Sequence, residues 1–104
     1  MKNVDLVCPI DLPVREVFPP ASRFAHTSVW HGPEHAARVM VHAFLLVELT
    51  GSHDLSVPLW ASVYVHDLAR AHDDVCHHHG KDAADLLSRD DELRAHLSRG
   101  GARR

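Results

Sequence analysis

The sequence has few of the residues that would tie it to a membrane, a disulfide framework or nucleic acid. Its two cysteines, Cys8 and Cys76, lie far apart without CxxC spacing, so we expect reduced thiols. No apolar run reaches about 18 residues, which predicts no membrane-spanning helix. The N-terminus lacks the apolar core of a signal peptide. A formal net charge of -3 with neutral histidines argues against a broad nucleic-acid-binding surface. We therefore expect a cytoplasmic protein.

Histidine is the residue in excess. The chain of 104 residues holds 11 histidines beside ordinary apolar and charged fractions of 45% and 24%. They are spread from His26 to His96 rather than gathered at a terminus, so a purification tag does not explain them. A histidine-rich composition favours metal binding. The length predicts one small domain with one modest core.

Proline and the charged C-terminus divide the chain into three parts. The four prolines within residues 1–20 rule out a long helix, so we expect an arm that packs on the domain. A helical domain is predicted over residues 21–98, and a flexible basic tail over 99–104. The side chains expected to pack from the arm and the segment after it are Val14, Val17, Phe18, Phe24 and Trp30.

The fold class predicted from apolar spacing is all-α, a small bundle of about four to five helices. The first long helix should start at Gly32-Pro33, because proline is favoured at the first helical position, and Gly51 should end it. Its apolar residues recur at helical spacing: Ala36, Val39, Met40, Ala43, Phe44 and Val47. Three further leucines predict burial on two sides: Leu45, Leu46 and Leu49.

The next helix is apolar nearly all round and should be the centre of the core. Asp54 or Ser56 is its expected N-cap, and Pro58 fits the first turn. We expect a polar loop over 71–80, then a short helix over 81–87. The inner face of that short helix should hold Ala83, Ala84 and Leu87. Asp90 should cap a last helix that ends at Leu97.

Helix order predicts a meeting of His35 with His66-Asp67. His35 lies in the first turn of one helix and the doublet at the end of the next, and a short loop makes such helices antiparallel neighbours. Two imidazoles and a carboxylate suit Zn, Mn, Fe, Co or Ni, and three protein ligands leave positions for water. The alternative is a hydrogen-bonded His-Asp pair without metal. Other possible metal ligands are His31, on the other side of the helix start from His35, and the clusters His72-Asp73-Asp74 and His77-His78-His79.

Three motifs carry a resemblance to a known family. His35-Ala-Ala-Arg38-Val39 resembles the H-x-x-R-V motif of the HD-domain metal-dependent phosphohydrolases, and His66-Asp67 resembles their name-giving doublet. The strings from His31 to Val39, His66 to Arg70 and His79 to Ala84 are similar to a subgroup of small HD proteins with H-G-x-x-H and H-G-x-x-A-A motifs. The resemblance covers about residues 28–87.

The resemblance implies an all-helical phosphohydrolase that acts on phosphomonoesters or phosphodiesters, often nucleotides. It implies a divalent cation (Mn, Fe, Ni, Co, Zn or Mg) on His35, His66 and Asp67. His79, and less directly His31, would hold a second metal or a substrate phosphate, so Asp67 and His79 are the expected catalytic residues. Two arginines are the expected phosphate contacts, Arg38 and Arg70.

The family's last ligand, an Asp on a later helix, has no matching context here. The remaining acidic residues that could take this position are Asp82, Asp85, Asp90 and Asp91. The alternatives are therefore a metal- or nucleotide-binding module without turnover, or a helical oligomerisation domain. A missing last helix would leave apolar surface exposed, and we expect a homodimer to bury it.

Overall fold

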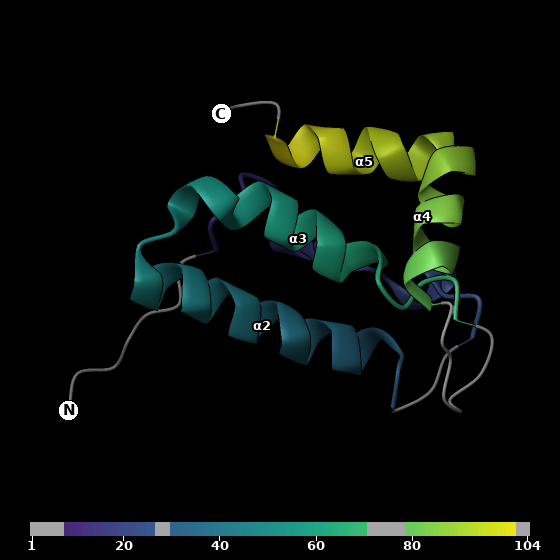
Figure 1. Cartoon of the computed structure of the whole chain (residues 1–104), viewed down its shortest axis with the longest axis horizontal. Coiled ribbons are helices and arrows are strands. Elements are labelled where there is room, and N and C mark those ends of the chain that lie inside the picture. The colour runs from purple at the N-terminus through teal and green to yellow at the C-terminus, as the bar shows by residue number, and fades with distance from the viewer. Residues whose placement is uncertain (1–7, 27–29, 71–78, 102–104) are drawn as a thin grey trace.

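Helices make up the regular structure of the described residues. The computed structural model describes residues 8–26, 30–70 and 79–101, and no strand occurs among them. The α-helices are α1 (Val14–Val17), α2 (Pro33–Thr50), α3 (Ser56–Val65), α4 (His79–Arg89) and α5 (Asp91–Gly101), with short 3₁₀ helices at Ala21–Arg23 and His53–Leu55 (Figure 1). The predicted all-α bundle is confirmed. Within the described part, no helix is both long enough and apolar enough to cross a membrane.

Helix α2 begins and ends where the sequence predicts. Pro33 is its first residue, and Gly51 follows its end in the left-handed region at φ 70° with its N–H bonded to the Val47 carbonyl. The predicted apolar stripe is buried except for Val39, which is half-buried. The prediction that α2 is buried on two sides is wrong, since Leu46 is 59% and Leu49 69% exposed.

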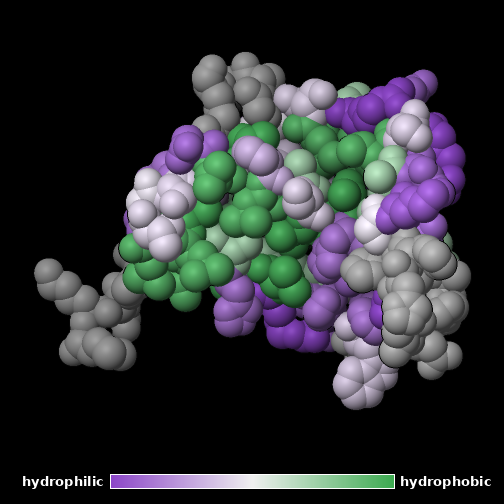
Figure 2. Space-filling model, viewed as in Figure 1, coloured by the Kyte–Doolittle hydropathy of each residue, from purple (hydrophilic) through white to green (hydrophobic). Residues whose placement is uncertain are grey.

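Helix α3 lies between α2 and α5, and this arrangement explains the exposed leucines (Figure 1). Because α5 packs on α3, nothing in the described structure buries Leu46 and Leu49 on the outer side of α2. Figure 2 shows an apolar area over α2 and α3 on the face in view. The exposed large apolar side chains of this helix pair and its connection are Val41, Leu46, Leu49 and Leu55.

Helix α3 is the centre of the core, as predicted. Trp60 and Tyr64 are 0% and 2% exposed, and their rings pack edge to face. Pro58 is in the first turn, as expected. The N-cap prediction is wrong. A 3₁₀ turn precedes α3, so Leu55 takes the N-cap position without a side-chain hydrogen bond.

The N-terminal arm is held against α3 and α5. Val17 is fully buried, and its carbonyl accepts a hydrogen bond from the Trp60 Nε1 at 2.8 Å. Phe18 and Phe24 also pack in the core. Two predictions of burial are wrong, because Val14 and Trp30 are each 68% exposed.

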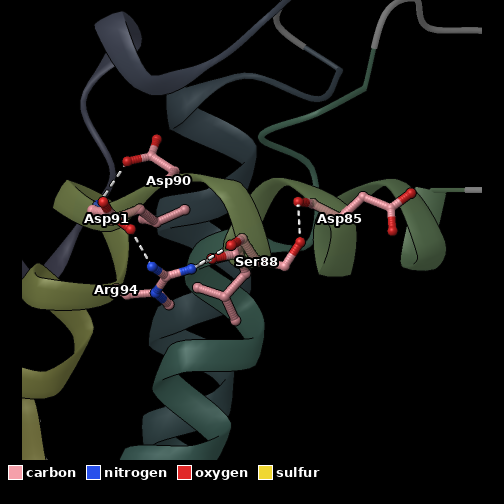
Figure 3. A network of polar contacts seen from close by, with 7 residues as sticks. Asp85, Ser88, Asp90, Asp91 and Arg94 are labelled. Carbon is pink, nitrogen blue, oxygen red and sulfur yellow. Dashed lines mark hydrogen bonds and ion pairs between the residues drawn. The ribbon is translucent and has the colours of Figure 1, made fainter.

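Helices α4 and α5 join at a polar corner (Figure 3). The Leu93 N–H donates to Asp90 Oδ1 at 2.9 Å, so the predicted N-cap is confirmed. Arg94 pairs with Asp91 and donates to the carbonyls of Leu87 and Ser88 at the end of α4. These contacts satisfy carbonyls that a helix end leaves without partners.

Both C-terminal helices are longer than predicted. Helix α4 begins at His79, two residues early, and its inner face holds buried Ala83 but not Ala84, which is exposed. Helix α5 continues to Gly101, so the predicted tail over 99–104 is wrong for its first three residues. Packing explains the extension: a Cβ at Gly100 would overlap the Trp60 indole, so the helix backbone lies directly against the core. Residues 102–104 lie outside the described residues.

Candidate metal centre

Three side chains from two helix ends form the candidate site. Helix α2 begins and α3 ends on the same side of the molecule, which is the right side of Figure 1. His35 is in the first turn of α2, His66 is the C-cap of α3, and Asp67 follows it. One donor atom from each of the three lies within 4.8 Å of the others. The antiparallel helix pair thus brings together the three residues that helix order predicts.

Two of the three distances between the donor atoms are close to those expected for ligands of one cation. Asp67 Oδ2 lies 3.0 Å from His66 Nε2 and 3.5 Å from His35 Nε2. Ligand atoms about 2.1 Å from one metal ion are separated by about 3.0 to 3.4 Å in octahedral or tetrahedral geometry. Asp67 is 5% exposed, whereas the imidazoles are about one-third exposed, so the site opens to solvent on the histidine side.

The backbone fixes which nitrogen of His66 faces the carboxylate. His66 Nδ1 lies 2.6 Å from the Val63 carbonyl oxygen. A carbonyl oxygen only accepts, so Nδ1 carries the hydrogen and Nε2 of a neutral ring has a lone pair. That lone pair would point at the Asp67 carboxylate. This arrangement suits a proton shared by these two atoms, and it would also allow both atoms to bind one metal ion.

The pKa directions fit such a site. The hydrogen bond to Asp67 raises the pKa of His66 against the opposing effect of burial. Burial alone would raise the pKa of Asp67, but the hydrogen bond and charge of His66 outweigh it and lower the pKa. Burial lowers the pKa of His35. The lowered pKa values favour an ionised Asp67 and a neutral His35, which are the forms that bind metal ions, whereas the raised pKa of His66 opposes the loss of its proton.

The other predicted site residues surround this group without joining it. The His31 ring meets the His35 ring edge to face at a centroid distance of 5.8 Å, but His31 is not one of the three residues whose donor atoms converge. Arg38 is exposed one turn along α2 from His35, and Arg70 lies three residues beyond Asp67. The positive charge of Arg38 contributes to lowering the pKa of His35, and that of Arg70 opposes the rise at His66.

Several predicted ligands fall outside the described residues. His79 is the first residue of α4, but its side chain, which the predicted metal or phosphate role concerns, lies outside the described part. The clusters His72-Asp73-Asp74 and His77-His78 lie there too.

The acidic residues considered for the last ligand do not converge on the site among the described residues. Asp85 pairs with Lys81, and Asp91 pairs with Arg94. Asp90 caps α5 and lies 3.7 Å from Arg23. The group of converging ligand atoms in the described part therefore consists of two imidazoles and one carboxylate.

Sequence reasoning did not identify the Val63 carbonyl as part of the site. Its role comes from the main chain at the end of α3, and no residue type marks it. The position three residues before His66 is its only sequence signal. No protein-family model, curated protein or solved structure matches the chain.

Proposed function

We propose that the protein is a divalent-metal-dependent phosphohydrolase of the HD type. One observation carries the proposal: the Val63 carbonyl turns the His66 Nε2 lone pair toward the Asp67 carboxylate, at a point that His35 also faces. A hydrogen bond that fixes the tautomer of a ligand histidine is a common feature of metal sites. The motifs that resemble the HD family include the same three residues.

The chain's own residues divide the work. His35, His66 and Asp67 would hold the cation, and the Asp67 carboxylate would reduce its net charge. When bound, the cation supplies the Lewis acidity that activates water for attack on phosphorus. Arg38 and Arg70 flank the site and offset charge on the phosphoryl oxygens of a phosphomonoester or phosphodiester, including a nucleotide. His79 and His31 are the residues proposed for a second cation or for the phosphate.

Metal binding is tested first, because turnover depends on it. Untagged protein freed of metal is titrated with Mn²⁺, Ni²⁺, Co²⁺, Zn²⁺ and Mg²⁺ while the melting temperature is followed. A free metal concentration about 100 times Kd should raise the melting temperature by about 10 °C or more. His66→Ala and Asp67→Ala should abolish the rise, and His53→Ala is the matched control on an exposed histidine. An unchanged melting temperature with every metal would refute the metal site.

Hydrolysis is tested on phosphomonoesters, phosphodiesters and nucleotides with the metal that binds. The wild-type protein should turn over at least one class, and His66→Ala and Asp67→Ala should lower the rate by at least about a hundredfold. Arg38→Gln should raise KM more than it lowers kcat if it contacts the phosphate in the ground state. Activity that survives both ligand substitutions would place hydrolysis elsewhere.

A second candidate is a metal- or nucleotide-binding module without turnover. It is favoured by the ligand count, since the described residues supply three converging ligands, and Asp85 and Asp91 pair with Lys81 and Arg94 instead. Metal-dependent stabilisation without hydrolysis of any of the three substrate classes would select this function.

A further inference from the structure

A cleft separate from the three converging ligands opens between the N-terminal arm and helices α3 and α5. In Figure 1 the N-terminal segment, in purple, passes behind α3. The cleft has a volume of about 400 Å³. This volume lies within the range of about 300 to 1,000 Å³ that is usual for small-molecule sites. The residues that line it are Arg15, Glu16, Pro20, Arg23, Tyr64 and His96.

The carboxylates near the cleft are already engaged. Arg99 holds the Glu16 carboxylate at two points, 3.1 Å and 3.3 Å, which is the bidentate geometry of a guanidinium with a carboxylate. Asp90 accepts the N–H of Leu93 through one oxygen, and its other oxygen forms an ion pair with Arg23 at 3.7 Å. Three guanidinium groups (Arg15, Arg23 and Arg99) thus lie near two carboxylates, which leaves the cleft with an excess of positive charge.

Tyr64 adds a neutral donor to these charges. The Tyr64 phenol lines the cleft together with Arg23, and its O–H can donate to a bound acceptor. The His96 ring packs on Tyr64 at a centroid distance of 5.1 Å and is held by a bond of 2.6 Å from Nε2 to the Glu16 carbonyl. The cleft wall is therefore fixed before a ligand arrives.

We propose that this cleft is a second binding site, which takes the phosphate group of a small anionic ligand between Arg15, Arg23 and Tyr64. Two guanidinium groups from different elements and one phenol supply more donors than the two oxygens of a carboxylate can accept, whereas a phosphate offers three or four oxygens. The volume beyond the phosphate leaves room for a small organic part against Pro20 and His96. The site requires no metal ion, which separates it from the proposed phosphohydrolase function.

The test is an NMR titration of metal-free protein with inorganic phosphate, at constant ionic strength, following the Arg23 Nε–H and the His96 ring. Phosphate should shift these signals saturably, and acetate should bind at least about tenfold more weakly. Arg15→Gln and Arg23→Gln should each weaken phosphate binding by about tenfold. Tyr64→Phe should weaken it by a smaller factor. Lys81→Gln removes an exposed charge on α4 and should leave the affinity within about twofold.

Two outcomes would overturn the proposal. One is a response that chloride reproduces or that never saturates, because this would mean charge screening only. The other is binding that Asp67→Asn abolishes while Arg15→Gln has no effect, because the phosphate would then sit at the metal centre. Arg15 is exposed, so its variant keeps the test valid even if Arg23→Gln does not fold. A parallel titration with phenyl phosphate distinguishes the sources: tighter binding indicates a phosphorylated small molecule, and equal binding indicates phosphate itself.

Discussion

A single imidazole, His66, decides which cation the candidate centre holds. Its Nδ1 hydrogen is committed to the Val63 carbonyl, so the charge state of the ring is controlled entirely at Nε2, 3.0 Å from Asp67. With a proton on Nε2, the pair is an ion pair. With a metal ion there, the ring is neutral.

Asp67→Asn should lower the pKa of His66. The hydrogen bond to the carboxylate is the largest cause of its raised value, and an amide carries no charge to stabilise the imidazolium. The measurement is a histidine titration of metal-free protein by NMR. Asp85→Asn, which removes a carboxylate paired with Lys81 on α4, is the control and should leave the His66 titration unchanged. An unaltered His66 curve in Asp67→Asn would contradict the geometry of the pair.

Gly100→Ala should destabilise the protein by about 1 to 3 kcal/mol, since the added methyl overlaps the fully buried Trp60 ring. Gly80→Ala is the matched control. Its Cβ would meet nothing within 4 Å, and the helix propensity of alanine should stabilise α4 by up to about 1 kcal/mol. Urea unfolding of the two variants measures the difference. If Gly100→Ala left the free energy of unfolding unchanged, α5 would not pack on Trp60.

At the scale of the helix, Asp90 fixes where α5 begins. Asp90→Ala should cost about 1 kcal/mol, because it removes the side-chain acceptor of the Leu93 N–H. Asp90→Asn keeps an acceptor and loses only the charge that faces Arg23, so its cost should be at most a few tenths of a kcal/mol. Chemical denaturation distinguishes the two variants. An equal loss in both would assign the stabilisation to the ion pair rather than to the cap.

Local signals predicted the bounds of α2 well, but they predicted the start of α3, the bounds of α4, the end of α5 and several packing partners poorly. Gly32-Pro33 and Gly51 marked α2 because proline and glycine act through their own backbone geometry. The burial of Leu46 and Leu49 was predicted wrongly, since it depends on a layer that packs on α3 instead. The meeting of His35 with His66 and Asp67 followed from helix order. The contact of His96 with the Glu16 carbonyl joins residues 80 positions apart, and no sequence pattern marks it.

For the whole molecule, a rise in pH above 6.5 should change the stability of the metal-free and the metal-bound protein in opposite directions. The raised pKa of His66 stabilises the metal-free fold below 6.5, and this contribution is lost as pH rises through the folded-state pKa. The lowered pKa of Asp67 stabilises the fold above 3.8, and this contribution is lost as pH falls through its folded-state pKa. The pair therefore contributes most between these two values.

Added metal should reverse the loss of stability that the metal-free protein shows as pH rises through the folded-state pKa of His66. Binding requires a neutral His66, so the metal-induced rise in melting temperature should grow between about pH 5.5 and 8. The measurement compares melting curves across this range with and without the metal that binds. His66→Ala, which has no proton to displace, should flatten the pH dependence in both series. A metal effect that shrinks as pH rises would contradict binding at Nε2.

Hydrogen exchange at the Trp60 indole N–H reports how often the N-terminal arm detaches from the core. This hydrogen is fully buried and donated to the Val17 carbonyl, so it can exchange with deuterium only after the arm leaves α3 or the whole chain unfolds. Trp30, at 68% exposure, supplies a second indole in the same molecule for reference. The ratio of the two exchange rates would measure how often the N-terminal segment detaches in the native protein. A ligand that fills the cleft between arm and core should slow the Trp60 exchange alone.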